Sequence, residues 1–239
     1  MNMKTQVILV LLLTTISTYT LAEAPEPIHQ KILPGNALIN TSKIYPHHIQ
    51  YQKTGGLMEY QLELIKLDNR DTFELKIFFN RSENSKPDTI YFDAETLGYV
   101  GRHLDMQGYV IDVYFKEGLF SGVLDPKPHS NYKKVKYHKN YPHNAFEPAI
   151  INYFIAALPL EVGFKASLPV FDLNNGSQMF WSNVEVVAKE DITYQGNTVS
   201  AWKVKSDGIK KKTIWISDKY PFALKMKTKG SFGTWTVAD

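Results

Sequence analysis

Polar and apolar residues alternate with a period of two along most of the chain after residue 45, as they do in β-strands that have one buried face. The alternation is unbroken in Glu59–Leu64 and returns over residues 72–79. The segment between them, Asp68–Asp71, is short and consists mostly of residues that tolerate tight turns. The two segments are therefore predicted to form an antiparallel hairpin.

Further segments with this pattern follow one another too closely for crossover helices in most of the chain. They cover residues 89–92, 99–105, 109–115, 120–124, 132–138, 163–171, 179–188, 198–204, 213–217, 222–227 and 232–237. So many antiparallel strands bury their apolar faces by curling into a barrel or by splitting into packed sheets. The predicted fold class is mainly β: a single antiparallel β-barrel, open or closed, of ten or more strands with one main α-helix packed on or in it.

The one segment with a helical period is Pro148–Leu158. Its apolar residues fall at i, i+3, i+4 and i+7, at Ile151, Phe154, Ile155 and Leu158. Proline is tolerated in a first helical turn, and a second proline follows Leu158. This helix is predicted to lay its apolar stripe against the sheet and to act as the plug or gate of a barrel.

The N-terminal residues have the layout of a secretory signal peptide, predicted over residues 1–22. Lys4 precedes the apolar run Val7–Leu13, and the small residues Ala22 and Ala24 follow a polar stretch. The run is too short to cross a bilayer, so no transmembrane segment is expected in the mature protein. Residues 23–44 are rich in proline and are interpreted as an extended arm, and residues 45–239 as one β-barrel-like domain.

The charge and the cysteine content of the chain limit the cellular compartments and the kinds of partner that we expect. The chain has 27 Lys and Arg against 24 Asp and Glu. This small positive net charge gives an electrostatic field too weak to indicate nucleic acid as the main partner. It has no cysteine, which in an exported protein favours a bacterial periplasm over a disulfide-forming animal secretory pathway. Without cysteine the protein cannot be a lipoprotein anchored through an N-terminal Cys. The predicted localisation is periplasmic.

Candidate chemistry is sparse. The seven histidines lack the spacing of metal ligands on one strand or helix, so neither a metal nor a cofactor is predicted. The basic run at residues 133–139 fits an anionic surface, but it also fits the wet face of an ordinary or edge strand. The same holds for the lysines at 210–212.

Enzymatic activity stays open, and no catalytic residue is predicted. The chain has no nucleophile-elbow, zinc-protease or phosphate-loop motif. Asp93, Glu95, Asp105 and Asp112 are the acids that a glycosidase-like site would have to bring together inside a barrel.

Aromatic residues make up 13% of the chain, and core packing explains most of them. A barrel of eight or more strands either fills its lumen with side chains or leaves a cavity for an apolar ligand. The residues predicted to line such a cleft are Phe154, Trp181, Trp202 and Trp215.

Several short motifs resemble those of a known family. They are the Asp-x-x-Thr-Leu turn at Asp93–Leu97, Gly122–Leu124, Leu158–Gly163, Val184–Val186, Trp202–Val204, Thr213–Ser217 and Pro221–Leu224. In this order they resemble the exported bacterial proteins of domain-of-unknown-function family three-one-zero-eight (DUF3108), and more loosely the open-barrel lipoprotein carriers of the LolA and LolB type. The resemblance implies a periplasmic, largely antiparallel open barrel wrapped on a helix, with no assigned activity.

The leading functional hypothesis is a non-enzymatic periplasmic binding or carrier protein for an apolar or amphipathic, lipid-like envelope ligand. The alternative is an envelope assembly factor that adds a partner strand to an exposed sheet edge. A third hypothesis is a glycan or ester hydrolase.

Overall fold

The computed structural model describes residues 45–51, 56–79, 86–142, 144–173, 177–208, 210–228 and 233–238. The expected signal peptide at 1–22 and the arm at 23–44 lie outside these residues. Within them, no helix has both the length and the apolar character needed to span a membrane.

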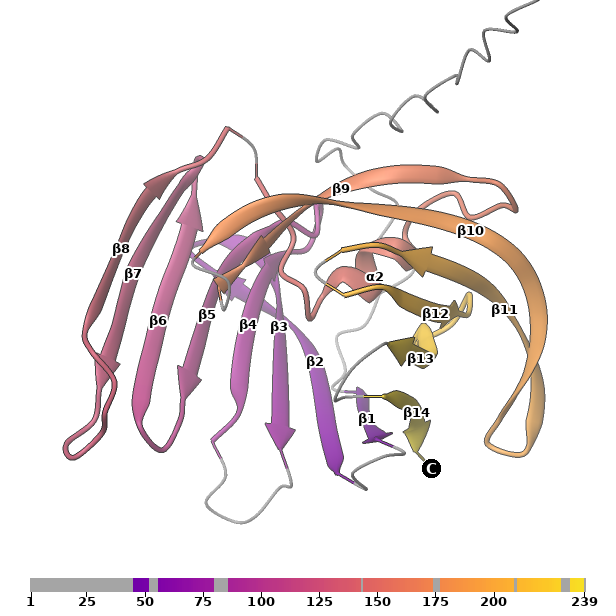
Figure 1. Ribbon diagram of the computed structural model, residues 1–239, viewed down its shortest axis with the longest axis horizontal. Coiled ribbons are helices and arrows are strands. Elements are labelled where there is room, and N and C mark those ends of the chain that lie inside the picture. The colour runs from indigo at the N-terminus through magenta and orange to yellow at the C-terminus, as the bar shows by residue number, and fades with distance from the viewer. Residues whose placement is uncertain are drawn as a thin grey trace, which may run out of the picture.

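In the described part of the chain, fourteen strands form one antiparallel sheet (Figure 1). The strands of the first half are β1 (Tyr45–Tyr51), β2 (Leu57–Leu67), β3 (Arg70–Phe79), β4 (Asp88–Asp93), β5 (Tyr99–Asp105), β6 (Tyr109–Lys116), β7 (Leu119–Pro126) and β8 (Val135–Asn140). Those of the second half are β9 (Lys165–Asp172), β10 (Gln178–Tyr194), β11 (Asn197–Ser206), β12 (Lys212–Ile216), β13 (Ala223–Thr228) and β14 (Thr234–Ala238).

The path of the chain through the sheet is simple. It starts in the middle at β1, runs strand by strand to one edge at β8, crosses to the opposite edge at β9, and returns strand by strand to β14. The strands β1 and β14 then pair in the middle, for example through Ile49 and Val237. In Figure 1 the strands of the two halves of this continuous sheet run in different directions.

Local sequence explains the hairpins. β2 and β3 pair as predicted, and the two residues between them, Asp68 and Asn69, have φ values of 49° and 64°. Asp and Asn adopt this left-handed conformation more readily than other non-glycine residues. The turn between β10 and β11 uses Gln195 and Gly196 in the same way, with φ values of 48° and 72°.

The prediction of a mainly β, antiparallel fold with one helix is confirmed for the described residues. The predicted barrel is not confirmed. Its closure would require the two outermost strands, β8 and β9, to pair with each other, and instead each lies at an end of the sheet. Alternation of polar and apolar residues is the same in an open sheet and in a closed barrel, so the sequence pattern did not distinguish them.

The helix is shorter than predicted. α2 spans Ile151–Ala156, and the residues from Pro148 to Ile150 form turns that lead into it. Its buried side chains are Ile151, Tyr153, Phe154 and Ile155, and it contacts β12 and β13. The predicted apolar stripe is therefore present, and it covers one face of the second half of the sheet.

The segment before α2 also covers the β9 edge. The backbone N–H of Phe146 donates to the carbonyl of Pro169, and the N–H of Phe171 donates to the carbonyl of Phe146, both at 2.8 Å. These bonds form a short parallel bridge along β9. Because unpaired strand edges attract other strands, this bridge and the proline in β9 protect that edge from foreign pairing.

Candidate functional site

The four rings predicted to line one cleft lie on two faces of the sheet. Phe154, on α2, is fully buried, and Trp202 packs against the same core from β11. Trp181 precedes the buried Ser182 on β10, which places it on the opposite face, and it is 40% exposed. Trp215 also lies on that face of β12, between the inward-facing Ile214 and Ile216. The four rings therefore do not line one common cleft.

Aromatic rings fill the side of the sheet that carries α2, where the apolar ligand was expected. The ring centroids of Phe146 and Phe154 are 3.8 Å apart, and those of Phe120 and Phe171 are 4.4 Å apart. All four residues are fully buried. Phe154 is thus a core residue in this structure.

Asp93, Asp105 and Asp112, three of the four acids considered for a hydrolase, each have a local partner other than a second carboxylate. Asp93 accepts hydrogen bonds from two backbone N–H groups of the turn that follows β4, and Glu95 is exposed in that turn. Asp105 forms ion pairs with two lysines, and Asp112 lies 2.6 Å from the ring nitrogen of His103. Among the described residues no group of three or more His, Asp or Glu side chains is placed to hold a metal ion; His29 and His143 lie outside them.

The outward face of β11, β12 and β13 gathers lysines around Trp215. We call its six residues the lysine face: Lys203, Lys205, Thr213, Trp215, Lys225 and Lys227. Register pairs them in two rows across the three strands, with Thr213 between Lys205 and Lys227, and Trp215 between Lys203 and Lys225. Since successive side chains of a strand point to opposite faces, residues two apart on each strand share this face.

Trp215 holds one row of the lysine face in place. Its Nε1–H donates to the Glu190 carboxylate at 2.5 Å, and Lys203 donates to the same carboxylate at 3.2 Å. The amines of Lys203 and Lys225 lie 5.5 and 5.0 Å from the centroid of the Trp215 ring. The hydrogen bonds from Trp215 and Lys203 hold the pKa of Glu190 below its usual value. Trp215 and Lys203 are therefore already bound to Glu190, and both lysines of this row pack on the Trp215 ring.

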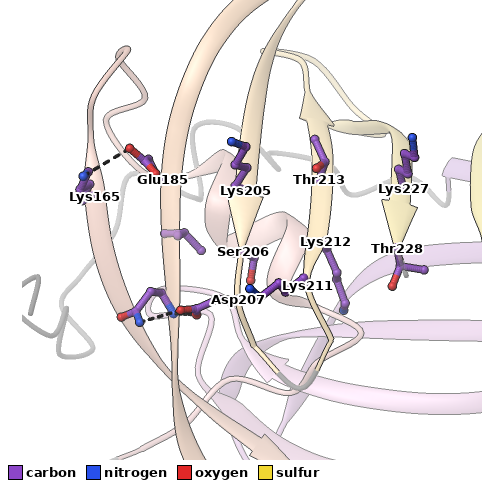
Figure 2. A pocket seen from close by; sticks show the side chains of 12 residues that line it. Lys165, Glu185, Lys205, Ser206, Asp207, Lys211, Lys212, Thr213, Lys227 and Thr228 are labelled. Atoms are coloured by element: carbon purple, nitrogen blue, oxygen red, sulfur yellow. Dashed lines mark hydrogen bonds and ion pairs between the residues drawn. The ribbon is translucent and has the colours of Figure 1, made fainter. Parts of the chain in front are cut away.

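The other row, Lys205–Thr213–Lys227, lines part of a cavity of about 660 Å³ that lies at the ends of β9, β11, β12 and β13 and beside the middle of β10 (Figure 2). Its charged lining residues are Lys165, Lys205, Lys211, Lys212 and Lys227 together with Glu185 and Asp207. A second hollow of about 430 Å³ lies over the lysine face and shares Thr213 and Lys227 with the first. The row thus lies where the two hollows meet.

Five lysines face two carboxylates in this cavity, and both carboxylates are occupied. Glu185 pairs with Lys165 at 3.3 Å, and Asp207 accepts hydrogen bonds from the backbone and side chain of Asn183 at 2.8 and 3.0 Å. Within the described ranges, Lys205 and Lys227 have no ion-pair partner. The cavity therefore carries an excess of positive charge that suits an anionic group.

A buried charge cluster anchors the segment before α2 to the first half of the sheet. Arg102, on β5, donates to both oxygens of Asp88 at 2.8 and 2.5 Å and to Glu147 at 3.0 Å. Asp88 and Glu147 are 3% and 4% exposed. Burial raises the pKa of Glu147, whereas the two carboxylates hold the pKa of Arg102 above its usual value against the effect of burial.

The raised pKa of Glu147 predicts a component of stability that falls with pH. The folded protein binds this proton more tightly than the unfolded chain, so the component is complete below about pH 4.3 and is lost as pH rises through the folded-state pKa. We expect the difference in unfolding free energy between wild type and Glu147→Gln to decrease over that interval. Urea unfolding at a series of pH values measures it, with the exposed Glu95→Gln as control. A difference that rises with pH would contradict the prediction.

The strands that carry the lysine face and the buried cluster lie within residues 88–236, which match the model of a family described as a protein of unknown function, DUF3108. The chain belongs to the DUF3108 family. The resemblance seen in the sequence motifs is thereby confirmed for DUF3108, while the likeness to LolA and LolB stays a loose one. No curated protein and no solved structure matches this DUF3108 chain.

Sequence reasoning missed the four lysines of the lysine face. The signal was present, because lysines recur two residues apart in Trp202–Lys205 and in Leu224–Lys227. Each segment alone indicates only a strand with one wet face. The pairing of β11, β12 and β13 is what brings the four amines together.

Proposed function

We propose that this DUF3108 protein is a periplasmic binding or carrier protein for an amphipathic envelope ligand, and that the lysine face binds the anionic group of that ligand. The observation that supports this most is the positive excess of the cavity beside the Lys205–Thr213–Lys227 row. Clefts lined by one sign of charge concentrate ligands of the opposite sign. The predicted signal peptide at residues 1–22 and the lack of cysteine support a periplasmic location.

An exposed aromatic ring beside the cavity supports the amphipathic character of the ligand. Asn183 and Glu185, on β10, line the cavity, and Trp181 lies two residues from Asn183 on the same face of that strand. Its side chain is 40% exposed. Tryptophan is enriched at interfaces that are apolar on one side and face water on the other. We infer that the apolar part of the ligand lies on the outer face rather than in the packed core.

Native mass spectrometry of the full chain, purified from its own periplasm without detergent and followed by lipid extraction, tests the proposal. We expect a bound amphipathic molecule of defined mass. In the variant Lys205→Glu/Lys227→Glu the occupied fraction should fall about tenfold or more, because two favourable charge contacts become repulsive. The exposed pair Lys133→Glu/Lys136→Glu makes the same change in net charge outside the cavity and should keep the ligand.

Two results would contradict this function. One is an empty protein that also takes up no added anionic phospholipid or fatty acid. The other is a bound lipid whose occupancy falls equally in the cavity variant and in the control variant. The second result would show that only the overall charge of the protein matters.

A second candidate function rests on the β8 edge. Among the described strands β8 pairs only with β7, and most of its side chains are exposed. An open edge can accept a strand from a partner, as an envelope assembly factor would require, although lysines such as Lys136 and Lys139 are typical of edges that avoid pairing. An empty protein that co-purifies with one envelope protein, and loses it on Val135→Pro, would favour this function over ligand carriage.

A further inference from the structure

The Lys205–Thr213–Lys227 row has the geometry of a site for one tetrahedral anion. The register places Thr213 directly opposite both lysines, on neighbouring strands. Neighbouring strands are about 4.8 Å apart, so the two lysine backbones flank the threonine at about 10 Å from each other. Figure 2 shows the three side chains pointing the same way. Two flexible lysine side chains can therefore converge above the threonine hydroxyl.

The donors of this row are available for a ligand. In the neighbouring row Lys203 donates to Glu190, and both Lys203 and Lys225 lie over the Trp215 ring. By contrast, Lys205 and Lys227 are exposed and form no ion pair with any described residue. The Lys203–Trp215–Lys225 row is thus held by contacts within the protein, whereas the lysines of the neighbouring row can bind a ligand.

The lining favours phosphate over carboxylate. Among the described residues that line the two hollows there is no arginine. Arginine suits the two parallel oxygens of a carboxylate, whereas lysines act as point charges that can each take a different oxygen of a phosphate. A threonine hydroxyl adds a third donor, directed at a third oxygen.

We propose that Lys205, Thr213 and Lys227 form a binding site for a phosphate group. The inference rests on the proposed function and specifies it: the anionic group of the ligand is a phosphate. The phosphate can belong to a lipid or to a soluble organic phosphate. The site binds the same group in either case.

Calorimetric titration of the full chain with inorganic phosphate, at constant ionic strength, tests the site. Acetate serves as the carboxylate comparison and should bind at least about tenfold more weakly. Lys205→Gln/Lys227→Gln should weaken phosphate binding by about tenfold or more, and Thr213→Val by roughly three- to tenfold without a change in charge. Lys133→Gln/Lys136→Gln should leave it unchanged. Absence of phosphate binding, equal binding of acetate, or equal loss in both double variants would overturn the proposal.

Two further arms identify the source of the phosphate. Glycerol 3-phosphate represents a soluble organic phosphate, and phosphatidylcholine vesicles that contain phosphatidic acid represent a lipid. Each should lose affinity in Lys205→Gln/Lys227→Gln, and whichever binds more tightly names the source. If phosphate binds but native mass spectrometry finds no lipid, the site stands and the carrier function fails. If native mass spectrometry finds a bound lipid but neither inorganic phosphate nor phosphatidic acid binds, the function stands and this inference fails.

Discussion

Arg102→Ala is expected to lower the free energy of unfolding by about 3–5 kcal/mol. The guanidinium is the cation that pairs with both Asp88 and Glu147, and its side chain is only 12% exposed. Removing it leaves two buried carboxylates without compensation, which costs far more than the loss of a solvated ion pair. The substitution also removes the ion pair between β5 and the segment before α2, which keeps its backbone hydrogen bond from the Tyr99 N–H to the Ala145 carbonyl. Urea unfolding followed by tryptophan fluorescence and circular dichroism measures the loss.

A matched control distinguishes the cost of leaving buried charges unpaired from the cost of losing an exposed ion pair. Lys66 and Asp71 form an ion pair at 2.8 Å in which both side chains are more than half exposed, so Lys66→Ala should cost less than about 1 kcal/mol. If uncompensated charge is the cause, adding Asp88→Asn and Glu147→Gln to Arg102→Ala should recover part of the loss. An Arg102→Ala protein as stable as Lys66→Ala would refute the anchoring role.

Phe154→Ala is expected to destabilise the protein by about 3–5 kcal/mol and to leave ligand occupancy unraised. The ring is fully buried and lies against Phe146, so its removal leaves a cavity that the surrounding side chains cannot fill. The exposed Trp181→Ala should have a much smaller effect on stability, about 1 kcal/mol or less. Urea unfolding gives the stability, and native mass spectrometry gives the occupancy.

This experiment also tests the idea that the helix gates a barrel. A gate residue would give a stable variant with increased ligand uptake, because its removal would open a path to the interior. The packing of α2 against β12 and β13 argues for the core role instead. A Phe154→Ala protein that keeps wild-type stability and takes up more ligand would restore the gate and contradict our interpretation.

The candidate site was predicted from the sequence only in part. Trp215 was among the predicted ligand-binding residues, and the structure places it in the lysine face. The four predicted cleft residues are not brought together, because Phe154 is buried in the core while Trp215 lies on the other face of the sheet. The basic residues at 133–139 lie close together in the sequence, so a local pattern contains them. The structure instead gathers the lysines of three separate strands.

The sequence by itself determined the local structure of this protein. Alternation with period two specified strands, residues such as Asp68 and Asn69 specified a hairpin turn, and the spacing of Ile151, Phe154 and Ile155 specified the helical face. These features depend on neighbours within a few residues, so a single sequence contains them.

Only the tertiary structure decided how these elements combine. It pairs β1 with β14 in the middle of the sheet, keeps β8 and β9 apart, and joins Arg102 to Glu147, which is 45 residues away. It also places Lys205, Thr213 and Lys227 side by side. Alternating strands satisfy the same burial pattern in many pairings, and the choice among them depends on long-range packing that no local pattern encodes.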